Sequence, residues 1–300
     1  MQPGDEEKRA VRHLGSFSHA EPSSHSAVQH VARSAAVTSP VLLAVAHGTV
    51  DPDGVRTLDS LVDRVRALAP GVGVELAYVD HVPPSVTRRL RELAAQKVEV
   101  AAVPLLLIAA AHSKGDIPAS INVVRAAHPD TRISYGRPLG PHPLLQSALD
   151  ARLREVGADP SYAVVLAAAG SADPDANAEV AKVARLLWEW RRGAPVESAY
   201  AGTTSPSVGT AIERLRRLGH DRVAVSPYFL APGRLPRSVA AAAEAGNAVL
   251  AGVLGDQEDV ARLVLERYAE ALAGDLRMNC DTCRYRAPQR PHSHPDDEST

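Results

Sequence analysis

The sequence predicts an α/β fold with two duplicated lobes, each a parallel β-sheet flanked by helices, and a cleft between the lobes. Three observations predict this fold. The chain has 300 residues, enough for two lobes with sizeable cores. From residue 41 onward, short aliphatic runs alternate with segments of helical periodicity, as in parallel βα units. The same short motifs then recur in the second half at a nearly constant offset.

In the first half, each aliphatic run predicts a strand and each periodic segment a helix. The second helix shows an apolar stripe at Val86, Leu90 and Leu93 and follows a pair of prolines that open it. Asp116 is expected to cap the third helix. The expected strands are 41–46, 72–79, 98–108 and 133–135, and the expected helices are 53–69, 84–96, 116–127 and 143–156.

The second half repeats this order of elements. Its expected strands are 162–168, 196–200, 223–230 and 248–251, and its expected helices are 175–190, 207–218, 237–245 and a last helix that runs through residue 272. The repeat extends to single residues, since the matching segments are Gly48 with Gly170, 51–53 with 173–175, 77–78 with 199–200, 84–86 with 206–208 and 103–107 with 226–230. A matched offset over several segments indicates that one lobe was duplicated.

Composition excludes several classes of protein. A net charge of -2 gives no general attraction to nucleic acid or to an anionic membrane surface, and no apolar run is long enough for a transmembrane helix. The only cysteines are Cys280 and Cys283, so a disulfide scaffold is excluded for the main body. No Walker loop or Gly-x-Gly-x-x-Gly fingerprint follows a strand, so no nucleotide is expected.

These features divide the chain into four parts. Residues 1–39 lack the apolar core of a signal peptide, so we interpret them as a disordered extension on a cytoplasmic protein. The extension has histidines that could capture metal, although nothing fixes their geometry: His13, His19, His25 and His30. Residues 40–158 form the lobe that carries the site, 159–275 a degenerate copy, and 276–300 a flexible tail with cysteine and histidine.

Three polar side chains follow strands of the first lobe. His47, Asp80 and His112 lie at or beyond the carboxyl ends of successive strands, where sites form in open parallel sheets. Taken singly, each has an ordinary structural interpretation as a backbone-satisfied histidine, a helix cap or a loop residue. Their counterparts in the copy are Ala169, Gly202 and Leu235, so all three are lost together while the scaffold remains. The sequence therefore places the site in the first lobe.

Two imidazoles and a carboxylate suit a divalent Fe, Co, Ni or Zn ion. Three ligands leave an open position, unlike a closed structural zinc site. Imidazole also accepts protons near neutral pH. Strand alternation predicts that His81 points away from Asp80.

At these residues the chain resembles the sirohydrochlorin chelatases, the class II tetrapyrrole chelatases of siroheme and cobalamin synthesis, in their long two-lobed form. The resemblance covers residues 41–272 and is carried by 46–49, 77–80 with Pro84, 103–107, 111–118 and 132–140. Thr49 stands where the family commonly has serine, and Asp80 where it often has glutamate. Asp80 is one methylene shorter than glutamate, so its carboxylate reaches less far than the family's usual residue.

The resemblance implies an ATP-independent lyase that inserts Fe²⁺ into sirohydrochlorin, with Co²⁺ insertion for cobalamin as the alternative. His47 and His112 would bind the metal and accept the pyrrole protons, and Asp80 would be a further ligand or orient a histidine. The basic residues expected to bind substrate carboxylates are Lys114, Arg137, Arg234 and Arg237. An ordinary solvated face is the alternative for each of these four.

The tail resembles Met-x-Cys-x-x-Cys tails associated with iron–sulfur clusters in some longer chelatases. Cys280 and Cys283 supply two of the usual four thiolates, so redox sensing, metal capture and a mobile tail stay open. The rival functions are a non-catalytic carrier of tetrapyrrole or metal, and metal-dependent hydrolysis. The sequence leaves a homodimer and a monomer both open.

Overall fold

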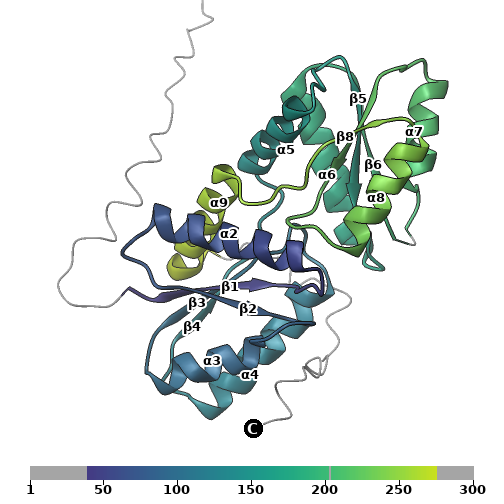
Figure 1. Ribbon diagram of the computed structural model, residues 1–300. Helices are drawn as coiled ribbons and strands as arrows, with labels where there is room; N and C mark the ends of the chain where they lie inside the picture. The colour runs from purple at the N-terminus through teal and green to yellow at the C-terminus, as the bar shows by residue number, and fades with distance from the viewer. Residues whose placement is uncertain (1–38, 203, 276–300) are drawn as a thin grey trace, which may run out of the picture. The chain divides into compact units, whose positions relative to one another are not determined.

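The computed structural model describes residues 39–202 and 204–275 (Figure 1). The histidines of the N-terminal extension and both cysteines lie outside these residues. The first half contains β1 (Val41–Ala46), α2 (Pro52–Leu68), β2 (Val74–Tyr78), α3 (Val86–Ala95), β3 (Val100–Pro104), the π-helical turn η1 (His112–Asp116), α4 (Ile117–Ala127), β4 (Ile133–Tyr135) and α5 (Pro143–Glu155). The second half contains β5 (Ala163–Ala168), α6 (Pro174–Arg191), β6 (Val196–Tyr200), α7 (Val208–Arg217), β7 (Val223–Pro227), α8 (Arg234–Ala245), β8 (Val249–Leu250) and α9 (Glu258–Ala273).

Both halves form a parallel four-stranded sheet with the same topology. The strand orders are β2-β1-β3-β4 and β6-β5-β7-β8, which confirms the predicted two-lobed α/β fold. The central strand β1 is aliphatic throughout and buried along its length apart from its first residue. Leu42 and Ala44 face one core cluster, whereas Leu43 and Val45 face another, so both sides of the sheet are covered, as parallel sheets require.

The duplication is visible in the backbone as well as in the sequence. Asp51 and Asp173 cap α2 and α6, and each accepts a hydrogen bond from the backbone N–H two residues later. Ser85 and Ser207 cap α3 and α7, and each hydroxyl accepts a hydrogen bond from the backbone N–H three residues later. The loops before these two helices each contain a cis proline, at 83–84 and 205–206.

The last helix of each half packs against the sheet of the other half. Helix α9 contacts α2 and β3 of the first sheet, as Figure 1 also shows, whereas α5 contacts α6 and β7 of the second. A buried ion pair joins Arg191 of α6 to Asp150 of α5 at 2.6 Å. Arg267 of α9 is fully buried and donates to the carbonyl oxygens of Pro138 and Leu139. One core cluster therefore runs from the first sheet to the second.

Several predicted boundaries differ from the structure. The third strand ends at Pro104 and not at Ile108, because its partner β1 pairs no further than Val45 with Pro104 and the chain then has no ladder to continue. For the same reason β7 ends at Pro227, before the predicted Leu230. Helix α8 begins at Arg234, three residues before the predicted start.

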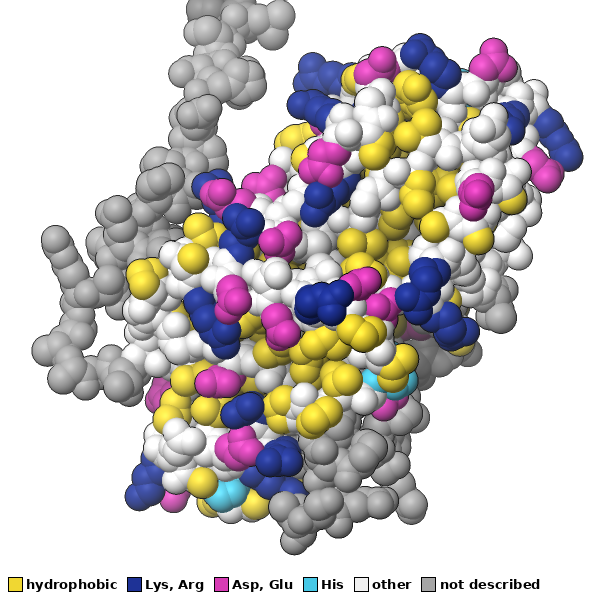
Figure 2. Space-filling view, in the orientation of Figure 1, with side chains coloured by type: hydrophobic (Ala, Val, Ile, Leu, Met, Phe, Trp, Pro, Cys, Tyr) yellow, Lys and Arg dark blue, Asp and Glu magenta, His cyan; other side chains and the backbone are white. Residues whose placement is uncertain are grey.

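The exposed surface mixes charges of both signs. Figure 2 shows Lys and Arg side chains interspersed with Asp and Glu on the face in view, without a broad area of one sign. This distribution agrees with the small net charge of the whole sequence. Within the part of the chain that the structure describes, no helix is both long enough and apolar enough to span a bilayer.

Candidate active site at the carboxyl ends of β1, β2 and β3

The ends of β1 and β2 are held together tightly. The backbone N–H of Asp80 donates to the carbonyl oxygen of His47 at 2.9 Å, so the two segments stay hydrogen-bonded just past the ends of the strands. Gly48 has φ +97°, and a Cβ there would lie 2.0 Å from the Asp80 carbonyl oxygen. Only glycine fits this close, left-handed turn, so the turn fixes where His47 lies relative to Asp80.

Three imidazole rings gather at this edge of the sheet. The ring centroids of His47 and His112 are 4.6 Å apart in an edge-to-face arrangement. The ring of His81 lies 5.5 Å from that of His47. The structure thus brings the two predicted histidines together and adds a third that the sequence reasoning had set aside.

The expectation that His81 points away from Asp80 is wrong. The β2 strand ends at Tyr78, so strand alternation does not reach His81, which has φ +71° in the turn that follows. The Asp80 carboxylate accepts the backbone N–H of His81 at 2.7 Å and lies 3.8 Å from its Nδ1. The negative charge of Asp80 therefore lies beside His81, at the edge of the cluster formed by the rings of His47, His81 and His112.

His112 is held by a carboxylate that the sequence reasoning assigned elsewhere. Its Nδ1 lies 2.6 Å from Oδ2 of Asp116, a buried side chain. Asp116 was predicted to cap α4, but it has helical backbone angles and makes no capping bond, because the turn η1 already precedes it. The His-x-x-x-Asp spacing was the available signal, since residues four apart meet on one face of a helix.

The turn η1 marks a one-residue difference between the halves. The pairing of β3 with β1 and of β7 with β5 equates Pro104 with Pro227. In the helices that follow, the fully buried Ile117 of α4 corresponds to the fully buried Val239 of α8. This match differs by one residue from the match of the strands, so the first lobe has one extra residue between strand and helix. The extra residue is absorbed where the N–H of Ile117 bonds to the carbonyl of His112 in a π-helical ring. Such π-bulges are frequent at functional sites.

The environment of His47 favours its neutral form. Burial lowers the pKa of His47 below its usual 6.5, and the neighbouring His112 and His81 lower it further, against a raising hydrogen bond to the Gly48 carbonyl and the charge of Asp80. Its Nδ1 lies 3.1 Å from that carbonyl oxygen, so Nδ1 carries the proton. Nε2 of neutral His47 then has a lone pair available for a metal or a proton. Within residues 39–202 and 204–275, no three His, Cys, Asp or Glu side chains are arranged around one common metal position.

The four basic residues expected to bind substrate differ in their surroundings. Lys114 contacts Asp173 of the second lobe at 2.6 Å, and Arg237 pairs with Asp51 of the first. Arg137 forms a two-pronged ion pair with Glu270, which raises the pKa of the guanidinium. Arg234 is exposed at the start of α8. Lys114 follows β3 and Arg237 follows β7, so these two cations occupy matching positions in the two lobes.

Comparison with known proteins decides the family. A family model described as CbiX matches residues 41–156 and 163–271, which is most of both lobes. The chain belongs to the CbiX family. A curated sirohydrochlorin cobaltochelatase from Priestia megaterium is 32% identical over 258 residues, covering 82% of this chain and 84% of that protein. A sirohydrochlorin ferrochelatase from Bacillus subtilis is 29% identical over 206 residues, covering 66% of this chain and 79% of its own length.

Solved structures agree with this membership of the CbiX family. The structure of SirB from Bacillus subtilis with Fe³⁺ is 27% identical and superposes with a TM-score of 0.69, covering 79% of this chain and 96% of that one. The sirohydrochlorin chelatase SirB from Bacillus subtilis subspecies spizizenii in complex with cobalt is 26% identical with a TM-score of 0.66, covering 78% and 96%. The fold and the predicted family are therefore confirmed.

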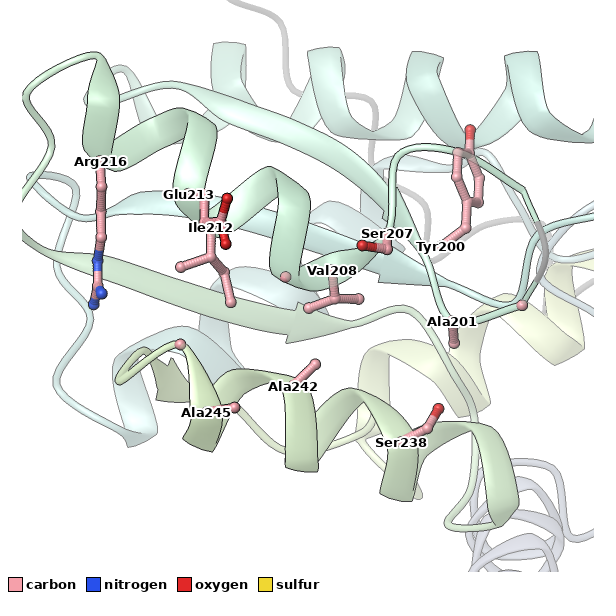
Figure 3. Close-up of a pocket in the computed structure, with 13 residues that line it drawn as sticks. Tyr200, Ala201, Ser207, Val208, Ile212, Glu213, Arg216, Ser238, Ala242 and Ala245 are labelled. Carbon is pink, nitrogen blue, oxygen red and sulfur yellow. The ribbon is translucent and has the colours of Figure 1, made fainter.

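A pocket of about 580 Å³ lies elsewhere in this CbiX-family chain, between α7 and α8 of the second lobe (Figure 3). Small residues such as Gly209, Ala242 and Gly246 line it and leave the helices apart. Its charged lining is limited to Glu213 and Arg216, and it includes none of the described histidines. The histidine cluster, and not this pocket, carries groups suited to metal chemistry.

Proposed function

We propose that this chain is an ATP-independent chelatase that inserts a divalent metal into sirohydrochlorin. The observation that carries the proposal is the edge-to-face pair of His47 and His112 at the strand ends of the first lobe. The CbiX match and the chelatase relatives in Priestia megaterium and Bacillus subtilis support the same reaction. The metal is a substrate of this reaction, and the protein holds it only until the macrocycle takes it.

The two histidines perform complementary tasks in the proposed mechanism. Both present Nε2, because Nδ1 of His47 faces the Gly48 carbonyl and Nδ1 of His112 faces the Asp116 carboxylate. A neutral imidazole with its proton fixed on Nδ1 can bind a metal or accept a pyrrole proton at Nε2. The macrocycle loses two protons as the metal enters, and the pair offers two acceptors.

The carboxylates support these histidines. Asp116 fixes the ring of His112 and holds its proton on Nδ1, as carboxylates behind metal-binding histidines do. Asp80 adds a negative charge next to His81, which favours the approach of a cation. We propose His47, His112 and Asp80 as the groups that receive the metal, with Asp80 acting beside the histidine pair.

We propose that substrate carboxylates bind the basic residues around this edge. Arg234 is exposed at the start of α8, and Lys114 and Arg237 exchange their aspartate partners for substrate carboxylates. Guanidinium and ammonium groups suit carboxylates. Arg137 is the last of the four candidates for binding a substrate carboxylate, because two of its N–H groups already donate to Glu270.

The test is an anaerobic insertion assay with sirohydrochlorin and Fe²⁺ or Co²⁺, following the macrocycle absorbance over several turnovers. His47→Ala and His112→Ala should each lower the rate by about 100-fold or more, as loss of a proton acceptor typically does. His220→Gln, in the loop between α7 and β7, serves as the matched histidine control and should keep the wild-type rate. Wild-type rates in both alanine variants would place the site elsewhere, and a single turnover without release would indicate a carrier.

The same assay separates the metals. Faster insertion of Fe²⁺ supports a role in siroheme synthesis, which the sequence places first, and faster insertion of Co²⁺ supports cobalamin synthesis. A separate proposal is an iron–sulfur or redox role for Cys280 and Cys283. Truncation after Leu276 tests it, since an unchanged rate and iron content would make the tail accessory.

A further inference from the structure

The chain between β3 and α4 carries His112 and has no strand to pair with. This stretch, residues 105–116, is called the His112 segment below. Past Leu105, whose N–H bonds to the Val45 carbonyl, the backbone has left the ladder with β1. Backbone N–H and C=O groups that leave a sheet in a partly buried place need other partners to stay in one position.

The second lobe supplies such partners at three points. The N–H of Ala109 donates to Oε2 of Glu179 at 2.9 Å, and the ammonium of Lys114 donates to Oδ2 of Asp173 at 2.6 Å. Asp173 caps the N-terminus of α6, and Glu179 lies in its second turn. The hydroxyl of Tyr228, a fully buried residue just after β7, donates to the carbonyl of Leu107 at 3.1 Å. The contacts lie on both sides of His112 along the segment.

Comparison with the reciprocal contact shows which of these the duplication explains. Asp51 uses Oδ1 to cap α2 and Oδ2 to accept from Arg237, just as Asp173 uses Oδ1 to cap α6 and Oδ2 to accept from Lys114. Each lobe thus offers its capping aspartate to the cation of the other lobe. This pair of contacts follows from the duplicated scaffold and distinguishes neither lobe.

The other two contacts occur in one direction only. The offset that equates Asp51 with Asp173 equates Thr57 with Glu179, and the hydroxyl of Thr57 donates within its own helix to the Asp53 carbonyl. The register that equates Pro104 with Pro227 equates Leu105 with Tyr228, and a leucine side chain cannot donate. The added polar side chains therefore act on the segment that carries a histidine.

We propose that Glu179 and Tyr228 of the second lobe are positioning residues for His112. The inference rests on the proposed function and adds to it: the degenerate lobe, which lacks the histidines, carries two side chains that hold the reactive segment of the other lobe. Burial raises the pKa of Glu179, while the Ala109 N–H and the charge of Lys114 lower it. Its bond to the segment needs an acceptor oxygen, which both a carboxylate and an amide provide.

The experiment compares Glu179→Ala, Glu179→Gln and Tyr228→Phe with the control Thr57→Ala, which removes the matched side chain of the first lobe. Insertion of Co²⁺ into sirohydrochlorin gives kcat and KM, and thermal unfolding confirms that each variant is folded. We expect Glu179→Ala to lower kcat about tenfold with KM for sirohydrochlorin within about twofold, because small misplacement of a reacting group is costly. Glu179→Gln should recover most of kcat, Tyr228→Phe should lower it several-fold, and Thr57→Ala should match the wild type.

A second readout does not depend on activity. In NMR spectra, the ring resonances of His112 are assigned by their absence in His112→Ala. They should shift and broaden in Glu179→Ala, whereas the ring resonances of His142 should not change. Unchanged kcat together with unchanged His112 resonances in Glu179→Ala would overturn the inference. Equal losses in Glu179→Ala and Thr57→Ala would also overturn it. A wild-type chain that inserts no metal refutes the proposed function, and the resonances then still decide whether α6 positions His112.

Discussion

The hydrogen bond between His112 and Asp116 gives the sharpest quantitative prediction. Its length of 2.6 Å and the burial of Asp116 indicate a charge-assisted bond. Replacing Asp116 by Asn keeps an acceptor oxygen but removes the charge, whereas replacing it by Ala removes the bond. Both changes leave the imidazole of His112 in the chain, so they test what the carboxylate behind the ring contributes.

The magnitude follows from the two kinds of bond. A hydrogen bond to a charged group contributes about 1.5–3 kcal/mol and a neutral one about 0.5–1.5 kcal/mol, so Asp116→Asn loses about 1–1.5 kcal/mol. At about 1.4 kcal/mol for each factor of ten, the rate of insertion should fall about tenfold. Asp116→Ala should fall about 10- to 100-fold, in the range usual for a carboxylate behind a metal-binding histidine.

The assay is steady-state insertion of Co²⁺ with sirohydrochlorin saturating, so that the change appears in kcat. Glu266→Gln is the matched control, because Glu266 pairs with Nε2 of His142 at 3.1 Å, and His142 is not one of the three clustered histidines. This control should keep the wild-type rate. If both Asp116 variants insert metal as fast as the wild type while His112→Ala does not, the carboxylate has no part in holding the reactive ring.

Three further predictions concern stability. Because the pKa of His47 is lowered below 6.5, the unfolded chain binds more protons below that pH, so urea titrations should show stability falling as pH drops through about 6.5, and less so in His47→Asn. A steeper fall in His47→Asn would contradict this sign. Gly48→Ala should cost at least about 2 kcal/mol because its Cβ meets the Asp80 carbonyl, whereas Gly209→Ala, which meets nothing, should change stability by less than about 1 kcal/mol. Arg191→Met should cost about 3 kcal/mol in the same titrations, because the buried Asp150 loses its partner, and a change below about 1 kcal/mol would refute that account.

Much of the fold could be predicted because local patterns and the repeat agree. The aliphatic run at 41–46 can only be buried on both faces, and the strand at 133–135 and the one at 196–200 have the predicted bounds. Strands β3 and β7 were predicted too long at their carboxyl ends. Their side chains remain apolar there, but the neighbouring strand has ended, and a pattern of side chains does not record where a hydrogen-bonding partner stops.

The candidate site was predicted in part. The duplication singled out His47, Asp80 and His112, and the structure brings the two histidines together. It also adds His81, which a left-handed turn directs to His47, and Asp116, which one extra residue in a π-helical turn places behind His112. Backbone geometry of this kind depends on how the segment packs, so residue spacing could indicate the Asp116 contact but could not predict the turn.

By itself, the sequence determined the duplicated α/β lobes and which copy kept its polar strand ends, because hydrophobic periodicity and residue identity are written locally. The tertiary structure decided which charges lie together. Lys114 contacts Asp173, Arg237 contacts Asp51, and Glu179 contacts the backbone beside His112. Each of these contacts joins residues far apart in the chain, and only the packing of one lobe against the other brings them within bonding distance.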